Sequence, residues 1–242
     1  MTAMFEPYEF AHLRLRNTIV RSATHDYVED ADGGVSKAQL QIYSTLAKNK
    51  VGLIFTGQMY VHLSGQAGSP QNSICDPALL PRLQELTRIV HENGSCIAAQ
   101  LSHAGAKASS PDRKAPSTIT LIEGKPAREM TFEEIAETRE QFVKAAVLAQ
   151  KAGFDGVQVH AAHHYLLSQF MTPSMNLRTD RYGGSGENRF RLCAEIIRGI
   201  KERCGEDFPV FIKLNSNIPV GDGNYEEELL AVTVKRLKAE GY

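Results

Sequence analysis

The sequence lacks the features that mark membrane-spanning, secreted and nucleic-acid-binding proteins. No apolar stretch approaches the ~18 residues of a membrane span. The opening MTAMFEPYEF has no charged start, apolar core or small-residue cleavage site of a signal peptide. The formal net charge is −1 and both signs are interspersed, without the clustered basic surplus of a nucleic-acid-binding surface. We therefore predict neither a membrane nor a nucleic acid as partner.

Paired cysteines and several signature motifs are also missing. The four cysteines, Cys75, Cys96, Cys193 and Cys204, are far apart and have no C-x-x-C spacing. This spacing argues against a disulfide framework or a structural zinc site, and a cytoplasmic location fits best. No G-x-G-x-x-G follows the first predicted strand, as a doubly wound nucleotide-binding sheet would usually require.

What the sequence does contain is a repeated alternation of apolar runs and amphipathic helices. The runs are rich in Val, Ile and Phe and apolar on both faces, which is typical of strands in a buried parallel sheet. The predicted strands are Thr18–Ala23, Gly52–Thr56, Ser95–Leu101, Gly156–His160 and Val210–Leu214.

A helix is predicted after each of these runs, and each has a recognisable start. Capping residues or an N-terminal proline mark the starts. The predicted helices are Ser36–Lys48, one from Asp76-Pro77 to Gly94, one from the Thr131–Glu134 capping box to Gly153, one from Ser185, and one from Asn224 and Glu227 with Leu230, Val234 and Leu237 as its apolar stripe.

Strand–helix alternation of this kind predicts an α/β fold with parallel strands. Polar residues gather at the C-terminal ends of several strands, as they do in a TIM (β/α)8 barrel. A full barrel needs eight units, and only five are found. The segment Ser102–Met130 is interpreted as a long excursion without hidden strands. We therefore expect residues 1–242 to be a single barrel domain that stops before its sixth strand.

The most distinctive stretch is VHAAHHYLLSQF, residues 159–170, at the end of a predicted strand. His160 and His163 could face one pocket, where two neutral imidazoles can each donate one N–H to a carbonyl oxygen. Tyr165, two residues later, can give a proton to a neighbouring carbon. Zinc binding is the alternative, but His103 is the only further histidine near a strand end, and H-E-x-x-H is absent. A polar cap without function is the third interpretation.

Two other strand ends and one loop carry polar residues that invite a functional interpretation. Gln100 and Lys213 would suit a planar heterocycle that needs an amide at its edge and a positive charge where electrons accumulate. Each could equally be structural, Lys213 as a lysine with its amine in water. The loop 176–185 could bind an anion at a helix N-terminus, but a loop held by Arg178 and Asp180 is favoured.

Five segments together resemble the old yellow enzyme family of NADH:flavin oxidoreductases and ene-reductases. They are NTIVRSAT, VGLIFTG, AAQLSHAGAKA, HAAHHYLLSQFMTPSMNLRTDRYGGSGENRFR and FIKLNSN, in the order of the chain. The resemblance covers essentially the whole chain, and the spacing is most similar to the bacterial branch that includes 2,4-dienoyl-CoA reductase-like enzymes. It implies the N-terminal portion of an eight-fold barrel.

The resemblance also implies a chemistry and a role for individual residues. FMN would be reduced by NADH or NADPH and would reduce the C=C bond of an enone-type small molecule. His160 and His163 would hold the substrate's carbonyl oxygen, and Tyr165 would donate the proton. The residues implied in cofactor binding are Ser22, Ala23, Thr24, Gly57, Gln100, His160 and Lys213, and no metal is implied.

Departures from the family pattern leave alternatives open. Lys213 stands where relatives often have arginine, and His25 and Asp26 occupy the region of a redox-tuning cysteine. The family's sixth to eighth strands, which grip the FMN phosphate, are not found. A related amine dehydrogenase-type flavoenzyme, or an inactive or assembly-dependent barrel fragment, therefore stays open. The fragment interpretation predicts unpaired edge strands, weak or no FMN binding by this chain alone, and homo-oligomerisation as one way to cover the edges.

Overall fold

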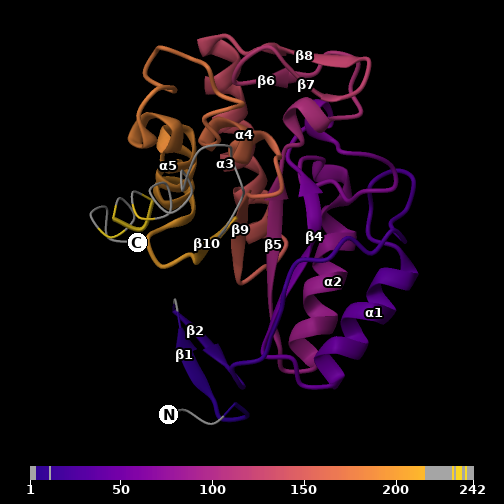
Figure 1. Ribbon diagram of the computed structural model, residues 1–242. Coiled ribbons are helices and arrows are strands. Elements are labelled where there is room, and N and C mark those ends of the chain that lie inside the picture. Colours follow the sequence, from indigo (N-terminus) through magenta and orange to yellow (C-terminus); the bar gives the residue numbers. More distant parts are fainter. Residues whose placement is uncertain (1–3, 11, 216–230, 232, 236–237, 239–242) are drawn as a thin grey trace.

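Five parallel strands form one curved sheet in the order β10-β9-β5-β4-β3. The computed structural model describes residues 4–10, 12–215, 231, 233–235 and 238. The strands are β3 (Val20–Arg21), β4 (Leu53–Tyr60), β5 (Cys96–Ser102), β9 (Gly156–Ala161) and β10 (Val210–Leu214). All five predicted strands are confirmed, although β3 is shorter than expected and β4 continues past Thr56. The sheet curls into part of a barrel (Figure 1).

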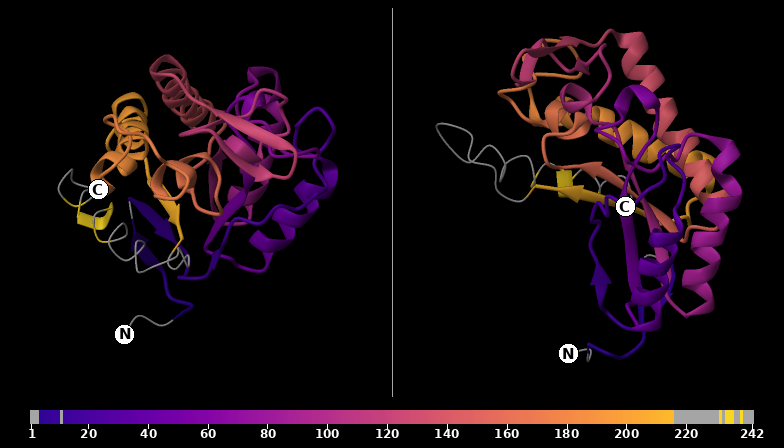
Figure 2. Two further views of the ribbon diagram at one scale, coloured as in Figure 1. Left: turned by 45° about the horizontal axis from the view of Figure 1, so that its top comes forward. Right: turned by 90° about the vertical axis from the view of Figure 1, so that its right-hand side faces the viewer.

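Helices cover one side of this sheet, which is the outer side of the barrel (Figure 2). They are α1 (Lys37–Lys48), α2 (Leu80–Glu92), α3 (Phe132–Lys151) and α5 (Gly186–Cys204), with the short α4 (Leu166–Met171) directly after β9. Three short 3-10 turns are η1 (Leu63–Gly65), η2 (Pro77–Leu79) and η3 (Gly105–Lys107). None of the helices within the described residues is long and apolar enough to cross a membrane.

The predicted helix starts are confirmed by their hydrogen bonds. The Ser36 and Thr131 side chains each accept the backbone N–H three residues on, in complete capping boxes. Ser185 accepts the N–H of Asn188 in the same way. The Asp76 side chain caps η2, which leads directly into α2. The expected helix start at Asn224 and Glu227, with Leu230 and Leu237, lies outside the described residues. Val234, expected on the apolar stripe of this helix, is described and is 42% exposed, so its predicted burial is wrong.

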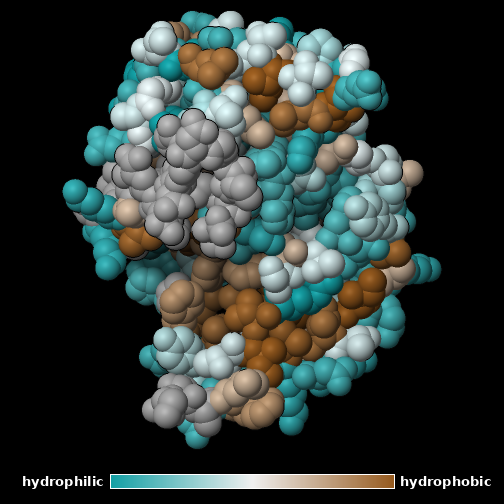
Figure 3. Space-filling view, in the orientation of Figure 1, coloured by the Kyte–Doolittle hydropathy of each residue, from teal (hydrophilic) through white to brown (hydrophobic). Residues whose placement is uncertain are grey.

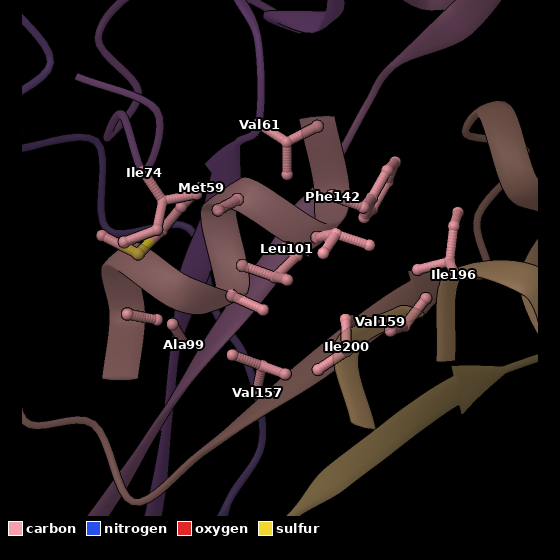
Figure 4. Packing of buried hydrophobic residues seen from close by; sticks show 14 of the residues in the cluster. Met59, Val61, Ile74, Ala99, Leu101, Phe142, Val157, Val159, Ile196 and Ile200 are labelled. Carbon is pink, nitrogen blue, oxygen red and sulfur yellow. The ribbon is translucent and has the colours of Figure 1, made fainter. Parts of the chain in front are cut away.

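The main core lies between the sheet and the helices (Figure 4). Alternate strand residues such as Ile97, Ala99, Leu101, Val157 and Val159 point to this side and are fully buried. They pack with helix residues in one continuous cluster. Burying a side chain of this size contributes about 1.5–3 kcal/mol, so this outer layer supplies most of the stability that holds the strands in place.

Two small sheets lie at opposite ends of the strands (Figure 1). The hairpin of β1 (Tyr8–Phe10) and β2 (Leu13–Leu15) lies at the end where the barrel strands begin, and was not predicted. The interpretation of Ser102–Met130 as free of strands is wrong. It contains β6 (Lys114–Ala115), β7 (Ile119–Ile122) and β8 (Lys125–Glu129), which pair with one another but not with the barrel sheet. β6 and β8 are short and contain charged residues, and the apolar β7 has only four residues, so none of them shows the longer apolar run by which the barrel strands were recognised.

Within the described residues, β3 and β10 are the two edges of the barrel sheet. Edge strands at Thr18–Ala23 and Val210–Leu214 were expected, and this expectation is confirmed. The sheet is curved strongly enough for the two edges to approach each other at one end, where the Lys213 amine donates to the Ser22 hydroxyl at 3.4 Å. The structure therefore brings residues nearly 200 positions apart in sequence to one end of the strands.

Candidate active site

The inner face of the sheet changes from apolar to polar along the strands. Leu53, Phe55 and Ala98 form a small apolar cluster with Phe211, near the beginning of the strands. Farther along β5 and β10, and on β9 between them, the inward-facing residues are polar: Gln100, Gln158, His160 and Lys213. Parallel strands end together, so these polar side chains form one group at the C-terminal ends of the strands, here called the mouth. This is the end at which barrel enzymes place their active sites.

His160, His163 and Tyr165 meet at the mouth. The His160 ring lies 5.1 Å from the His163 ring and 5.1 Å from the Tyr165 ring, edge to face in both cases. His160 is the last polar residue of β9, and Tyr165 is the N-cap residue of α4. Between them the chain turns back through His163 and His164, both left-handed, with φ of 58° and 55°. Such backbone is rare outside glycine and marks a turn that the surrounding structure enforces.

The turn is fixed by contacts from three other segments. The Asn215 side chain accepts the His163 N–H at 3.1 Å, and the Lys107 amine donates to the His163 carbonyl at 3.0 Å. The backbone carbonyl of His164 accepts the Gln169 side-chain amide at 2.8 Å. The His163 ring is thereby held on the exposed rim beside the buried His160 ring.

Both imidazoles are held in the neutral form. Burial, helped by the nearby His163 and Lys213, lowers the pKa of His160 to about 3. Burial and the positive charges of Lys213 and Lys107 also lower the pKa of His163. A neutral imidazole carries one N–H donor and one acceptor nitrogen. The pair can therefore offer two N–H donors to one oxygen without carrying charge themselves.

One nitrogen of His160 lacks a partner among the described residues. Its Nδ1 is completely buried and makes no hydrogen bond there. Buried polar atoms in native proteins nearly always have a partner, because leaving one unpaired costs about 1–3 kcal/mol. Other buried atoms of the described residues also lack a partner, so this nitrogen supports a ligand site through its place among the other polar side chains of the mouth.

The other residues predicted to bind a cofactor lie around the same mouth. Ser22, Ala23 and Thr24 follow β3, and the Thr24 hydroxyl donates to the Ser22 carbonyl at 3.1 Å. Gly57 lies against this segment so closely that a Cβ atom there would be 2.9 Å from the Thr24 carbonyl oxygen. Any side chain at position 57 would displace the segment.

The remaining two predicted cofactor-binding residues lie on β5 and β10. The Gln100 amide nitrogen donates to the Gln158 side-chain oxygen at 2.6 Å, which leaves the Gln100 oxygen as an acceptor. Lys213 lies next to His160 in the strand register, on the neighbouring strand. All nine residues that were singled out from the sequence therefore lie at one end of the sheet.

Two residues near the mouth were not singled out from the sequence. Gln58 donates to the Tyr165 hydroxyl at 2.9 Å, and Lys107 lies 5.7 Å from the centre of the Tyr165 ring. The glycine before Gln58 is a signal that could have revealed it, because an isolated glycine in a strand often marks a bulge. Lys107 is the last residue of the 3-10 turn η3, and no signal of comparable strength was recognised for it in the sequence.

The zinc alternative finds no support in the geometry. The described residues contain no group of three or more His, Cys, Asp or Glu side chains placed to hold a metal ion. His103 is buried, and its Nδ1 accepts the N–H of Gly105 at 3.1 Å. The loop 176–185 is held together by Arg178, whose guanidinium donates to Asp180 and to the carbonyls of Pro116 and Met130. This supports the structural interpretation of that loop.

Comparison with known proteins identifies the family. The sequence profile of the NADH:flavin oxidoreductase / NADH oxidase family matches residues 3–241. The chain belongs to this family. The predicted resemblance to the old yellow enzymes is thereby confirmed, as is the expectation of an oxidoreductase that uses FMN and a reduced nicotinamide.

Solved structures of family members superpose closely on the chain. Old Yellow Enzyme from Pichia sp. AKU4542 is 30% identical with a TM-score of 0.92, covering 98% of this chain and 68% of its own. A 2-naphthoyl-CoA reductase complex is 28% identical with a TM-score of 0.92, covering 98% and 39%. Morphinone reductase in complex with tetrahydroNAD is 25% identical with a TM-score of 0.90, covering 100% and 72%. The chain thus spans from 39% to 72% of the length of these relatives.

The mouth of this flavin oxidoreductase fits the polar edge of a flavin. His160 contributes an imidazole with an unpaired Nδ1, Gln100 an amide oxygen that can accept, and Lys213 a positive charge, all at the same ends of the strands. Because Gly57 has no side chain, the backbone of Thr24 can lie directly against it at the mouth. The donor set therefore agrees with the cofactor that the family implies.

Proposed function

We propose that this protein is an FMN-dependent ene-reductase that uses NADH or NADPH to reduce the C=C bond of α,β-unsaturated carbonyl compounds. The observation that carries the proposal is the meeting of two neutral imidazoles and a phenol, His160, His163 and Tyr165, at the mouth. Oxygen anchoring and proton donation to carbon are the two tasks that such a reduction demands of the protein.

His160 and His163 would hold the carbonyl oxygen of the substrate. When a hydride arrives at the β-carbon, electron density moves to this oxygen. Two N–H donors aimed at the oxygen stabilise that charge more than they stabilise the ground state, which is the condition for catalysis. Because the pKa of His160 is about 3, the ring acts as a hydrogen-bond donor and does not transfer its own proton at neutral pH.

Tyr165 would supply the proton that completes the reduction. Its O–H bond breaks as a C–H bond forms at the α-carbon, and the electron pair for that bond comes from the negatively charged substrate. The side chain is only partly buried, so solvent can return a proton to the phenolate afterwards. Positioned proton donors of this kind accelerate reactions by about 10²–10⁴-fold.

The remaining site residues would hold the cofactor. When bound, FMN supplies the two-electron chemistry by accepting a hydride from the nicotinamide and passing it to the substrate. Gln100 would bond the edge of the ring and Lys213 would place a positive charge beside it. Ser22, Ala23, Thr24 and Gly57 would line its other side, and His160 would contact both cofactor and substrate.

The proposal is tested by flavin binding and by turnover in two separate steps. The protein is incubated with excess FMN, desalted, and examined for visible flavin absorbance. Under anaerobic conditions NADH or NADPH should bleach this absorbance, and 2-cyclohexenone should restore it. Cyclohexanone, which has the carbonyl but no C=C bond, is the matched control and should not restore it. Absence of flavin binding at any FMN concentration, or equal re-oxidation by both ketones, contradicts the proposal.

We also propose that residues 1–242 belong to a single barrel domain in a cytoplasmic protein, with homo-oligomers in solution. The scattered cysteines support the location, since Cys75, Cys96, Cys193 and Cys204 are all free thiols. Among the described residues no further strand lies beside β3 or β10, and this supports self-association because unpaired edges favour contacts with other chains. Light scattering after size exclusion decides the second point, and a strictly monomeric mass contradicts it.

A further inference from the structure

Gln58 reaches the mouth because β4 contains a bulge. Phe55 pairs with Ala98 and Gln58 pairs with Gln100, so β4 uses one residue more than β5 over this interval. Side chains alternate between the two faces of a strand. The extra residue therefore moves Gln58 from the helix-covered side, where Ile54 lies, to the inner side.

The bulge is stabilised by hydrogen bonds at each of its irregular positions. The Gly57 N–H donates to the buried Tyr43 hydroxyl at 3.0 Å, and the Thr56 hydroxyl accepts the N–H of Gln100 at 3.0 Å. The Gln71 side chain donates to the Gln58 carbonyl at 3.2 Å. Unpaired backbone groups would make an irregular strand unstable, so these bonds fix where Gln58 is presented.

The side-chain amide of Gln58 is oriented by two hydroxyl groups. Its Nε2 donates to the Tyr165 hydroxyl at 2.9 Å, and its Oε1 accepts from the hydroxyl of the buried Ser102 at 3.1 Å. An amide nitrogen only donates and an amide oxygen only accepts. In this arrangement Gln58 uses the phenol oxygen of Tyr165 as acceptor and leaves the phenol hydrogen free.

We propose that Gln58 is a positioning residue for proton transfer from Tyr165, a role that rests on the proposed function. With an N–H on its oxygen, the phenol directs its own hydrogen away from Gln58 and towards the substrate. As that hydrogen leaves for the α-carbon, the electron pair of the broken O–H bond stays on the phenol oxygen. The Gln58 N–H then stabilises this negative charge. Ser102 keeps the amide from rotating to the opposite orientation.

The kinetic test compares Gln58→Met and Gln58→Glu with the unmodified FMN-loaded protein. Methionine keeps the length and removes the donor, whereas glutamate keeps the shape and, when ionised, can only accept. We expect 2-cyclohexenone to re-oxidise the reduced flavin about tenfold more slowly in Gln58→Met, as for the loss of one hydrogen bond. Gln58→Glu should be slower still, because its carboxylate binds the phenol hydrogen. Flavin reduction by the nicotinamide should be unchanged in both.

The pH profile separates positioning from a structural role. The rate of re-oxidation in Gln58→Glu should recover as the pH falls, because a protonated carboxyl group regains a donor. Gln58→Met should show no such recovery. Equal slowing of both half-reactions, or the same pH profile in both variants, would overturn the proposal, because a merely structural residue affects both steps and both variants alike.

A spectroscopic test measures the Gln58–Tyr165 contact without turnover. The hydroxyl-bearing ring carbon of tyrosine is labelled with carbon-13, and the Tyr165 signal is assigned by its loss in Tyr165→Phe. Gln58→Met should shift this signal, whereas Gln41→Met, on the exposed face of α1, should leave it in place. An unshifted signal in Gln58→Met overturns the proposal. If the unmodified protein fails to reduce the enone, the proposed function fails, and this signal still decides whether Gln58 holds the Tyr165 hydroxyl.

Discussion

The lower and upper halves of the inner sheet face are made by the same strands but serve different purposes. On β5, Ala98 packs in the apolar cluster and Gln100 lies at the mouth; on β10, Phe211 and Lys213 make the same change. The two residues of each pair are two positions apart on one strand, so their side chains are neighbours on the same face of the sheet. In Figure 3 hydrophobic residues gather in the lower centre of the view, and hydrophilic residues lie directly above them, to the right of the grey atoms.

The two halves also differ in how completely their groups are satisfied. The lower half needs only close packing, which Phe55 and Phe211 provide with their rings edge to face at 5.1 Å. The upper half leaves the buried Nδ1 of His160 without a partner among the described residues. Local rules of stability are usually broken where a protein binds its ligands. The comparison therefore assigns stability to the lower half and chemistry to the upper half, and each assignment can be tested by one substitution.

The largest effect is expected in the upper half, from Tyr165→Phe. This change removes the proposed proton donor but keeps the ring that contacts His160. Re-oxidation of the reduced flavin by 2-cyclohexenone should slow by about 10³-fold, in the middle of the range for general acids. The rate of flavin reduction by the nicotinamide and the midpoint of thermal unfolding should change little. If Tyr165→Phe also lowered the midpoint of thermal unfolding markedly, the upper half would contribute to stability as well, and the division between the halves would be wrong.

The sequence predicted the layered arrangement of this sheet because the physical signals are local. Apolar runs bounded by caps and turns predicted all five strands of the barrel sheet that the described residues form, and the positions of His160 and Lys213 at strand ends predicted the mouth. Alternation places Gln100 and Lys213 inward once the strands are known. These features depend on residues close together in sequence, so they can be predicted without knowledge of the tertiary structure.

What escaped prediction depends on contacts between distant segments. Gln58 follows Thr56, where the strand was expected to end, and simple alternation would have turned it outward. Only the pairing of β4 with β5 reveals the bulge. The strands β6 to β8 enclose only a small apolar cluster around Ala115 and Ala127, and ion pairs of Arg128 with Asp112 and Glu134 lie beside it. No periodicity marks such strands.

A smaller effect is expected in the lower half, from Phe55→Ala. Phe55 is 6% exposed and contacts Phe211, so its loss leaves a cavity in the apolar cluster. We expect the free energy of unfolding to fall by about 3 kcal/mol, the lower end for buried phenylalanines, because this cluster is small. Phe10→Ala is the matched control: Phe10 stacks on the same Phe211 ring but is 49% exposed. Its cost should be under about 1 kcal/mol.

Urea unfolding at neutral pH measures both variants. Under conditions in which Phe55→Ala is folded, its reduced flavin should be re-oxidised by 2-cyclohexenone at the rate of the unmodified protein. If Phe55→Ala slowed that rate as strongly as Tyr165→Phe does, the apolar cluster would be part of the chemistry and the division between the halves would be wrong.

The smallest effect concerns the loss of folding stability in acid. We expect the buried histidines at the polar end of the sheet to contribute to this loss, whereas the apolar cluster, which has no side chain that titrates in acid, should not. Burial lowers the pKa of His103, just beyond β5, to about 3, and that of His160 to about 3. Between these values and the ordinary value of 6.5, the unfolded chain binds protons that the folded protein does not. Stability is therefore complete above pH 6.5 and falls as the pH is lowered, by at most about 1.4 kcal/mol per pH unit for each group.

His103→Asn tests this sign, because asparagine keeps an acceptor for the Gly105 N–H but cannot be protonated. The variant should be less stable at neutral pH, yet lose less stability than the unmodified protein between pH 7 and about 5.5. His91→Gln should do the opposite. The hydrogen bond to Asp155 raises the pKa of His91, so this histidine stabilises the folded protein as it becomes protonated, and removing it should steepen the loss in acid. If the free energy of unfolding fell equally with pH in all three proteins, buried neutral histidines would not determine the loss of stability in acid.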